Sequence, residues 1–126
     1  MKKGLLLIAI LLITLANIAD AQQYQYGYRT SQTLTSAVAI EVSPAATLTV
    51  YTVAADTNIT YSADVSQAVI GDKIVLQVTA DASNRIQAFG DNLVAVNDTI
   101  TANKTVLYEF IYTGTAYYML GKLQAD

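Results

Sequence analysis

The chain has 126 residues, of which 53% are hydrophobic and 13% are charged, and its formal net charge is −3. This length allows one domain. It contains neither histidine nor cysteine, which excludes disulfides, the thiol nucleophile, the usual general base and most transition-metal ligands. The cations beyond residue 30 are isolated from one another, so no basic stripe is present that would favour binding to a nucleic-acid backbone: Lys73, Arg85, Lys104 and Lys122.

The N-terminal segment has the pattern of a secretory signal peptide. A positively charged start, Met1–Lys3, precedes an apolar run from Gly4 to Ile18, and small residues follow at Ala19 and Ala21. The run is shorter than the roughly 20 residues that span a membrane. We therefore predict that residues 1–21 form a hydrophobic signal helix that exports the protein to the periplasm, the extracellular space or a surface. A retained anchor is the alternative, and it would be the chain's one contact with a membrane.

The next segment lacks aliphatic side chains. Gln22–Arg29 reads Gln-Gln-Tyr-Gln-Tyr-Gly-Tyr-Arg. We expect residues 22–31 to form a Tyr/Gln-rich arm, either as a flexible start or as an edge strand that orders on contact. Its three tyrosines are candidate interface residues: Tyr24, Tyr26 and Tyr28.

From residue 32 onward the sequence is typical of an all-β domain. It is rich in Thr, Val, Ile and Tyr, which favour strands, and Asp72–Ala80 alternates apolar with mostly polar residues at the period of a half-buried strand. Turn-forming residues separate the short runs. The predicted strands are 32–42, 47–53, 58–62, 72–80, 85–89, 93–96, 105–113 and 116–120. We expect residues 32–126 to form a single antiparallel β-sandwich, jelly-roll-like or Greek-key, in which Thr113-Gly114-Thr115 closes a hairpin between the last two strands.

The carboxylates give little support for catalysis or metal binding. Most lie in predicted turns, where Asp bonds nearby backbone amides. Glu109 lies inside a strand between two aromatic residues, and it is the one candidate for partial burial or cross-strand pairing. The loop oxygen ligands that calcium would need are present without a recognised spacing: Asp81, Asn84, Asp91, Asn92 and Asp98. The sequence thus predicts a protein that is not an enzyme and that has no catalytic residues, no cofactor and no metal.

The most distinctive residue type is tyrosine, of which the chain has nine. A tyrosine ring suits both a protein core and an interface, because it is apolar with a polar tip. We expect Tyr108 and Tyr112 to fill the core. Tyr117 and Tyr118 are adjacent on one strand, so they face opposite ways and one ring lies outside the core; both are candidate interface residues.

The strand at 105–113 carries a second apolar row. Its even positions are predicted to face the core, whereas Leu107 and Ile111 flank Glu109 on the other face. An exposed apolar row of this kind marks an interface, and a central strand buried on both faces would produce the same pattern. Leu107 and Ile111 are therefore the remaining candidate interface residues, with both explanations open.

Two segments resemble small β-modules of bacteriophage tail-fibre and other virion structural proteins. They are Gly71–Thr79, which begins Gly-Asp before a hydrophobic strand, and Ile100–Tyr118, in which a Thr/Asn-rich turn leads to a strand, a Gly-Thr-Ala hairpin and an aromatic pair. Asp56–Thr60 is similar to a strand that precedes these elements in such modules. The resemblance covers about Leu48 to Leu120, and it implies a structural module, often trimeric and sometimes adhesive.

The functional prediction follows from the missing chemistry and from this resemblance. We expect a non-enzymatic structural or adhesive module that self-associates as a homo-oligomer, such as a trimer, on a virion or cell surface. Other virion or surface proteins and glycans are further expected partners. The alternative is a secreted carbohydrate-binding module that uses exposed tyrosines.

Overall fold

The computed structural model describes residues 29–44 and 46–125, and within them all regular structure is β. The predicted signal helix and Tyr24, Tyr26 and Tyr28 of the predicted arm lie outside the described residues. The first strand begins at Arg29, so the last three residues assigned to the arm belong to the folded part.

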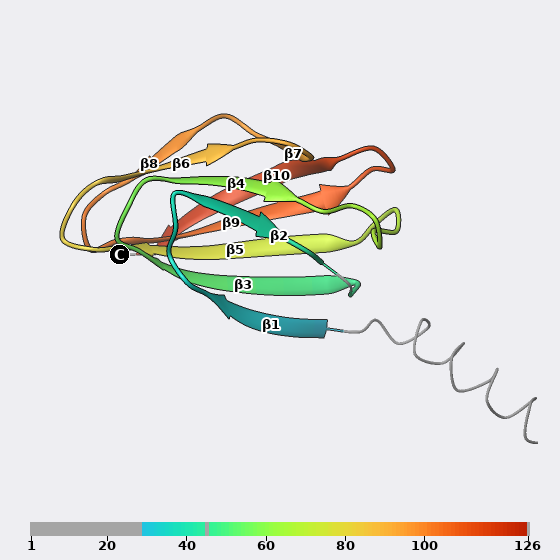
Figure 1. Ribbon diagram of the computed structural model, residues 1–126, viewed down its shortest axis with the longest axis horizontal. Helices are drawn as coiled ribbons and strands as arrows, with labels where there is room; N and C mark the ends of the chain where they lie inside the picture. Colours follow the sequence, from blue (N-terminus) through green and yellow to red (C-terminus); the bar gives the residue numbers. More distant parts are fainter. Residues whose placement is uncertain (1–28, 45, 126) are drawn as a thin grey trace, which may run out of the picture.

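Within residues 29–44 and 46–125, ten strands form two sheets that lie one over the other (Figure 1). Sheet A has six strands in the order β1 (Arg29–Leu34), β3 (Leu48–Ala55), β5 (Lys73–Ala80), β9 (Thr105–Tyr112), β10 (Tyr117–Ala125) and β7 (Leu93–Val94). Sheet B has four strands in the order β2 (Ala39–Val42), β4 (Ile59–Ala63), β6 (Arg85–Phe89) and β8 (Asp98–Ile100).

The chain winds between the sheets as a β-solenoid of about three turns. Each of the pairs β1–β2, β3–β4 and β5–β6 places one strand in each sheet, so that successive strands of a sheet are parallel. Such parallel neighbours require a crossover connection, which here is the strand of the other sheet. The solenoid ends where β8 pairs antiparallel with β6, and β9 with β5.

This architecture corrects the predicted antiparallel β-sandwich, and neither a jelly roll nor a Greek key is formed. The all-β class is right, but the strand partners are not, because the alternation of apolar and polar residues shows which face of a strand is buried and not the direction of its neighbour. The turns also differ in length: Leu48 lies opposite Arg29 and Lys73 lies opposite Leu48, which are steps of 19 and 25 residues. No fixed period therefore marks the solenoid in the sequence.

Several strand boundaries differ from the prediction; β10, for example, continues to Ala125 where the predicted strand ends at residue 120. The predicted strand at 32–42 is wrong, because the chain leaves sheet A after Leu34 and enters sheet B at Ala39. The short strand β8 was not predicted, since Asp98-Thr99-Ile100 follows a turn-like run of polar residues. The predicted hairpin is confirmed: β9 and β10 are antiparallel, and the Thr113 amide donates to the Ala116 carbonyl at 3.1 Å.

The core lies between the two sheets and is filled by one face of each strand. The alternation predicted for β5 is confirmed, since its four inward residues are buried and its four outward ones are half-buried. Four tyrosines are fully buried there: Tyr51, Tyr61, Tyr108 and Tyr117. Tyr112 is also buried, as expected, and its ring centroid lies 5.1 Å from that of Tyr117. In this protein without tryptophan, tyrosine rings supply much of the core volume.

Candidate functional site

The outer face of sheet A brings together apolar side chains from four strands, β3, β5, β9 and β10. The strand registers align them in rows across the sheet: Ile111 lies between Lys73 and Tyr118, and Leu107 lies between Gln77 and Leu123. Farther along the sheet, Val50 lies opposite Val75. We call this surface the outer apolar patch; its residues are Leu48, Val50, Val75, Leu107, Ile111, Tyr118 and Leu123.

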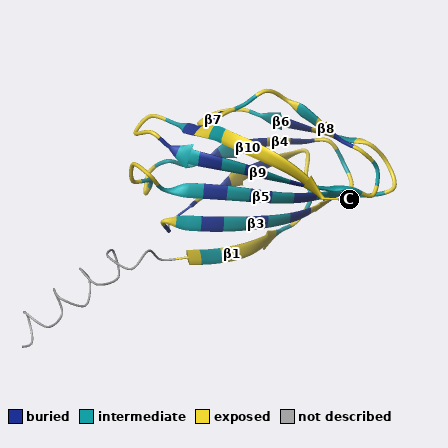
Figure 2. Ribbon diagram, turned by 180° about the vertical axis from the view of Figure 1, so that it is seen from behind, coloured by how far each residue is buried: buried dark blue, intermediate teal, exposed yellow. Residues whose placement is uncertain are grey.

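The patch faces away from sheet B, and no described strand covers it (Figure 2). Leu107 and Ile111 are half-buried by their neighbours on the sheet, whereas the even positions of β9 are buried in the core. Of the two explanations left open by the sequence, burial on both faces does not hold among the described residues. The exposed members concentrate on β10, where Tyr118 is 44% and Leu123 is 68% exposed.

One ion pair interrupts the patch. The Lys73 ammonium donates to Glu109 Oε1 at 3.0 Å, across strands β5 and β9. Both side chains keep more than two fifths of their surface in water, so the pair contributes little to stability. Glu109 is therefore cross-strand paired on the outer face.

The side chains of Tyr117 and Tyr118 lie on opposite faces of β10, as predicted. As a result, one of these two candidate interface residues is wrong. Tyr118 lies on the outer apolar patch beside Ile111, but Tyr117 is fully buried and packs in the core, so it cannot be an interface residue. The cause is the two-residue period of the strand. Burial also raises the pKa of the Tyr117 hydroxyl above its usual range.

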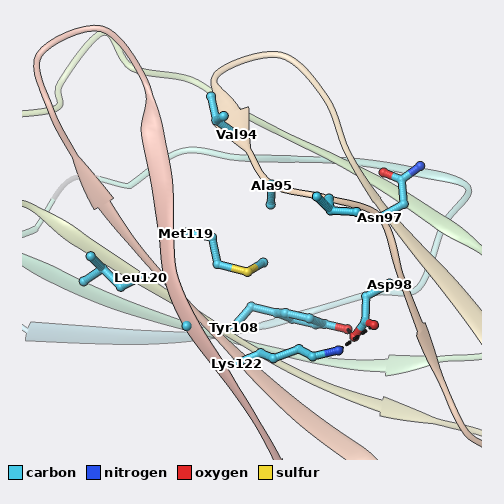
Figure 3. A pocket seen from close by; sticks show the side chains of 10 residues that line it. Val94, Ala95, Asn97, Asp98, Tyr108, Met119, Leu120 and Lys122 are labelled. Atoms are coloured by element: carbon cyan, nitrogen blue, oxygen red, sulfur yellow. Dashed lines mark hydrogen bonds and ion pairs between the residues drawn. The ribbon is translucent and has the colours of Figure 1, made fainter.

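A second feature is a surface cleft of about 540 Å³ beside β10 (Figure 3). It opens where the chain leaves β7 and crosses to β8 in the other sheet. Its walls come from this crossing segment, from β10 and from β9, and they are mostly apolar: Val94, Ala95, Val96, Asn97, Asp98, Tyr108, Met119, Leu120, Gly121 and Lys122. Sequence reasoning missed this cleft because it depends on how β7 and β8 diverge.

Asp98 is the polar centre of the cleft. Its carboxylate accepts a hydrogen bond from the buried Tyr108 hydroxyl at 2.9 Å and another from the Lys122 ammonium at 2.7 Å. Partial burial raises the pKa of Asp98, but these two hydrogen bonds and the charge of Lys122 outweigh it, so that the pKa lies below its ordinary value. Burial, reinforced by Asp98, raises the pKa of Tyr108 well above its usual range. The cluster links β8, β9 and β10 through these two hydrogen bonds. Each carboxylate oxygen of Asp98 already accepts one of them, so neither is available as a general base.

Three other carboxylates, those of Asp64, Asp72 and Asp81, each accept a hydrogen bond from a backbone amide two or three residues away, as is common in turns. Asp81 accepts two hydrogen bonds from the Arg85 guanidinium and one from the Ser83 amide, and these hold the pKa of Asp81 below its usual range. Within residues 29–44 and 46–125, no three acidic side chains gather as a metal site would require. In the same ranges no helix has the length and apolar character needed to cross a membrane.

Comparisons with known proteins do not place the chain in a family. No protein-family model matches it, and no curated protein matches it. A solved structure of a chaperone–substrate complex is similar in shape, with a TM-score of 0.46 and 15% sequence identity. The match covers 73% of this chain and only 17% of that one, and similarity at this level carries no argument about function.

Proposed function

We propose that the protein is an exported, non-enzymatic structural module that self-associates on a virion or cell surface. The observation that carries this proposal is the outer apolar patch, which extends over β3, β5, β9 and β10 and has no cover within the described chain. Contiguous exposed apolar surface of this kind usually marks an interaction site.

A second copy of the chain is the occupant that the charges favour. One cation and one anion lie side by side within the patch, Lys73 and Glu109, and Arg29 lies at its border, opposite Leu48. When two such patches meet about a twofold axis, each Lys73 can face the other copy's Glu109, so the contact is complementary to itself. Neither Lys73 nor Glu109 is then left unpaired when the surrounding leucine and valine side chains leave water.

The test is the double variant Leu107→Lys with Ile111→Lys. Both side chains point outward, so the variant should fold, and the added charges should lower the mass of the particle in size-exclusion chromatography with light scattering. The matched control is Thr60→Lys with Thr99→Lys, which adds the same charges at exposed strand positions of sheet B, away from the patch. An unchanged mass in a folded Leu107/Ile111 variant would contradict the proposal.

The alternative, a carbohydrate-binding module, has less support from the geometry. Among the described tyrosines only Tyr118 is well exposed, whereas stacking on sugars uses exposed rings. The cleft around Asp98 is another place for a small ligand, and a glycan array with an Asp98→Asn variant tests it. Glycan binding that this variant abolishes would favour the alternative.

A further inference from the structure

The strand β10 has an edge that no described strand pairs. On one side β10 pairs with β9 along its whole length, from Tyr117 to Ala125. On the other side β7 pairs only with Tyr117 and Tyr118 before the chain crosses to sheet B. Beyond that point, Leu120 to Ala125 are exposed on both faces of the sheet (Figure 2). An unpaired edge of this length is a template for another strand.

The direction of the backbone groups at this edge follows from the neighbouring strand. The Tyr112 amide donates to the Asp72 carbonyl, on the β5 side of β9. Backbone groups alternate sides along a strand, so Leu107 directs its amide and carbonyl to β10, where it lies opposite Leu123.

Leu123 therefore directs its own backbone groups back toward β9. The residues on either side of it, Lys122 and Gln124, direct their amides and carbonyls away from β9 and toward the open edge. This edge thus presents two donors and two acceptors, spaced as in an antiparallel sheet.

Natural proteins guard such edges with charged side chains and with bulges. A bulge is present between Met119 and Gly121, at the start of the open stretch, and none follows it as far as Ala125. The one charge on the open stretch, Lys122, is held in the cleft by its ion pair with Asp98 at 2.7 Å. At the centre of the stretch is Leu123, which is 68% exposed. From Lys122 to Ala125, the open edge therefore has neither a bulge nor an unpaired charge that would block another strand.

The sequence of β10 is complementary to itself in one antiparallel register. With Leu123 opposite the Leu123 of a second copy, the two side chains meet at the position where opposed side chains lie closest, because neither directs its backbone groups across the edge. Lys122 then lies opposite the second copy's Gln124 in a hydrogen-bonded pair, and no like charges are opposed. On either side of these pairs, Gly121 of one copy lies opposite Ala125 of the other, and both residues are small enough to avoid a clash.

We infer that two copies of the chain pair along the open edge of β10, antiparallel and centred on Leu123, to join their two A sheets into one. This inference rests on the proposed self-association and specifies one of its contacts. The pairing places the outer apolar patches of the two copies side by side on one face, with Leu107 and Leu123 of each copy in a continuous row. A twofold contact of this type closes on itself and gives a finite particle.

The test uses Gln124→Pro in the full chain, with Gln124→Thr as the matched control. Proline removes an amide that faces the open edge and leaves the ladder to β9 intact, since Gln124 does not bond β9 in this register. The expected result is that Gln124→Pro halves the mass measured by light scattering, whereas Gln124→Thr retains the wild-type mass. Circular dichroism checks that both variants fold.

A second measurement does not depend on any variant. Amide hydrogen exchange of the wild-type protein should show protection at Lys122 and Gln124 that is lost on dilution together with the oligomer. The inference would be overturned by unprotected amides at Lys122 and Gln124 in an intact oligomer, or by a folded Gln124→Pro variant with the wild-type mass. Neither result would contradict the proposed function, which the Leu107→Lys/Ile111→Lys variant tests separately. Protection independent of concentration would mean that a segment of the same chain occupies the edge, and it would also overturn the inference. A wild-type protein that is monomeric at every concentration would overturn the proposed function as well.

Discussion

At the scale of single residues, the buried tyrosines differ in whether the hydroxyl group has a hydrogen-bond partner. Tyr108 and Tyr61 are both fully buried in the core. The Tyr108 hydroxyl donates to Asp98, whereas the Tyr61 hydroxyl has no hydrogen-bond partner among the described residues. A buried hydroxyl stabilises a fold only when it is bonded, so these two rings should respond differently to the loss of the same atom.

We predict that Tyr108→Phe lowers the free energy of unfolding by about 1.5 kcal/mol, the lower end of the range for a hydrogen bond to a charged group. Lys122 still pairs with Asp98 in the variant, which limits the loss. Tyr61→Phe, the control, should leave the stability unchanged or raise it. Urea unfolding monitored by circular dichroism measures both, and equal losses would contradict the assignment.

The stability contributed by the hydrogen bond between Tyr108 and Asp98 should depend on pH. The pKa of Asp98 is lower in the folded protein than its ordinary value of 3.8, so the stabilisation from its charge is fully present above that pH and is lost as the pH falls through the folded pKa. The difference between wild type and Tyr108→Phe should therefore be constant near neutral pH and should shrink below about pH 4. A difference that grows on acidification would show that the carboxylate is not the partner.

At the scale of elements, the hairpin between β9 and β10 depends on Gly114. Its φ is +105°, in the region that residues other than glycine rarely adopt, and a Cβ there would lie 3.3 Å from the Ile70 side chain in the preceding loop. The hairpin was predictable from Thr113-Gly114-Thr115, because glycine supplies this conformation without steric cost. Its contact with Ile70 was not, since that loop is distant in sequence.

We predict that Gly114→Ala lowers the free energy of unfolding by about 1–2 kcal/mol, through backbone strain and contact with Ile70. Gly121→Ala is the matched control on the same hairpin, since a Cβ at Gly121 meets no atom within 4 Å; this change should be neutral or slightly stabilising. Thermal unfolding of the two variants provides the comparison. A similar effect of both would mean that the turn does not need its glycine.

At the scale of the whole molecule, sheet A is covered on its inner face and, among the described residues, uncovered on its outer face. Sheet B covers the inner face, but the outer apolar patch and the open edge of β10 have no partner within the described chain. Assembly through these surfaces would couple folding to association, because partners that bind only the folded state stabilise it by mass action.

We therefore predict that the midpoint of thermal unfolding rises with protein concentration. The Leu107→Lys/Ile111→Lys variant should show a weaker dependence, because it loses the contact of the patch. Differential scanning calorimetry over a hundredfold range of concentration measures this. A wild-type midpoint that does not change with concentration would contradict coupled assembly.

The all-β class, most strand positions, the inward face of β5, the terminal hairpin and the placement of Leu107 and Ile111 on the face of their strand opposite the core could be predicted from the sequence. Whether that second face is covered could not. The predictable features follow from local rules: the two-residue period, strand propensity and turn chemistry act within a few residues. Three features became known from the three-dimensional fold alone: successive strands run parallel around a solenoid, Tyr117 rather than Tyr118 is in the core, and Asp98 contacts Tyr108 and Lys122. Those features depend on which distant strands become neighbours, and a period of two is the same for a parallel and an antiparallel partner. The open edge of β10 belongs with them, because it exists only where β7 ends and the chain crosses to the other sheet.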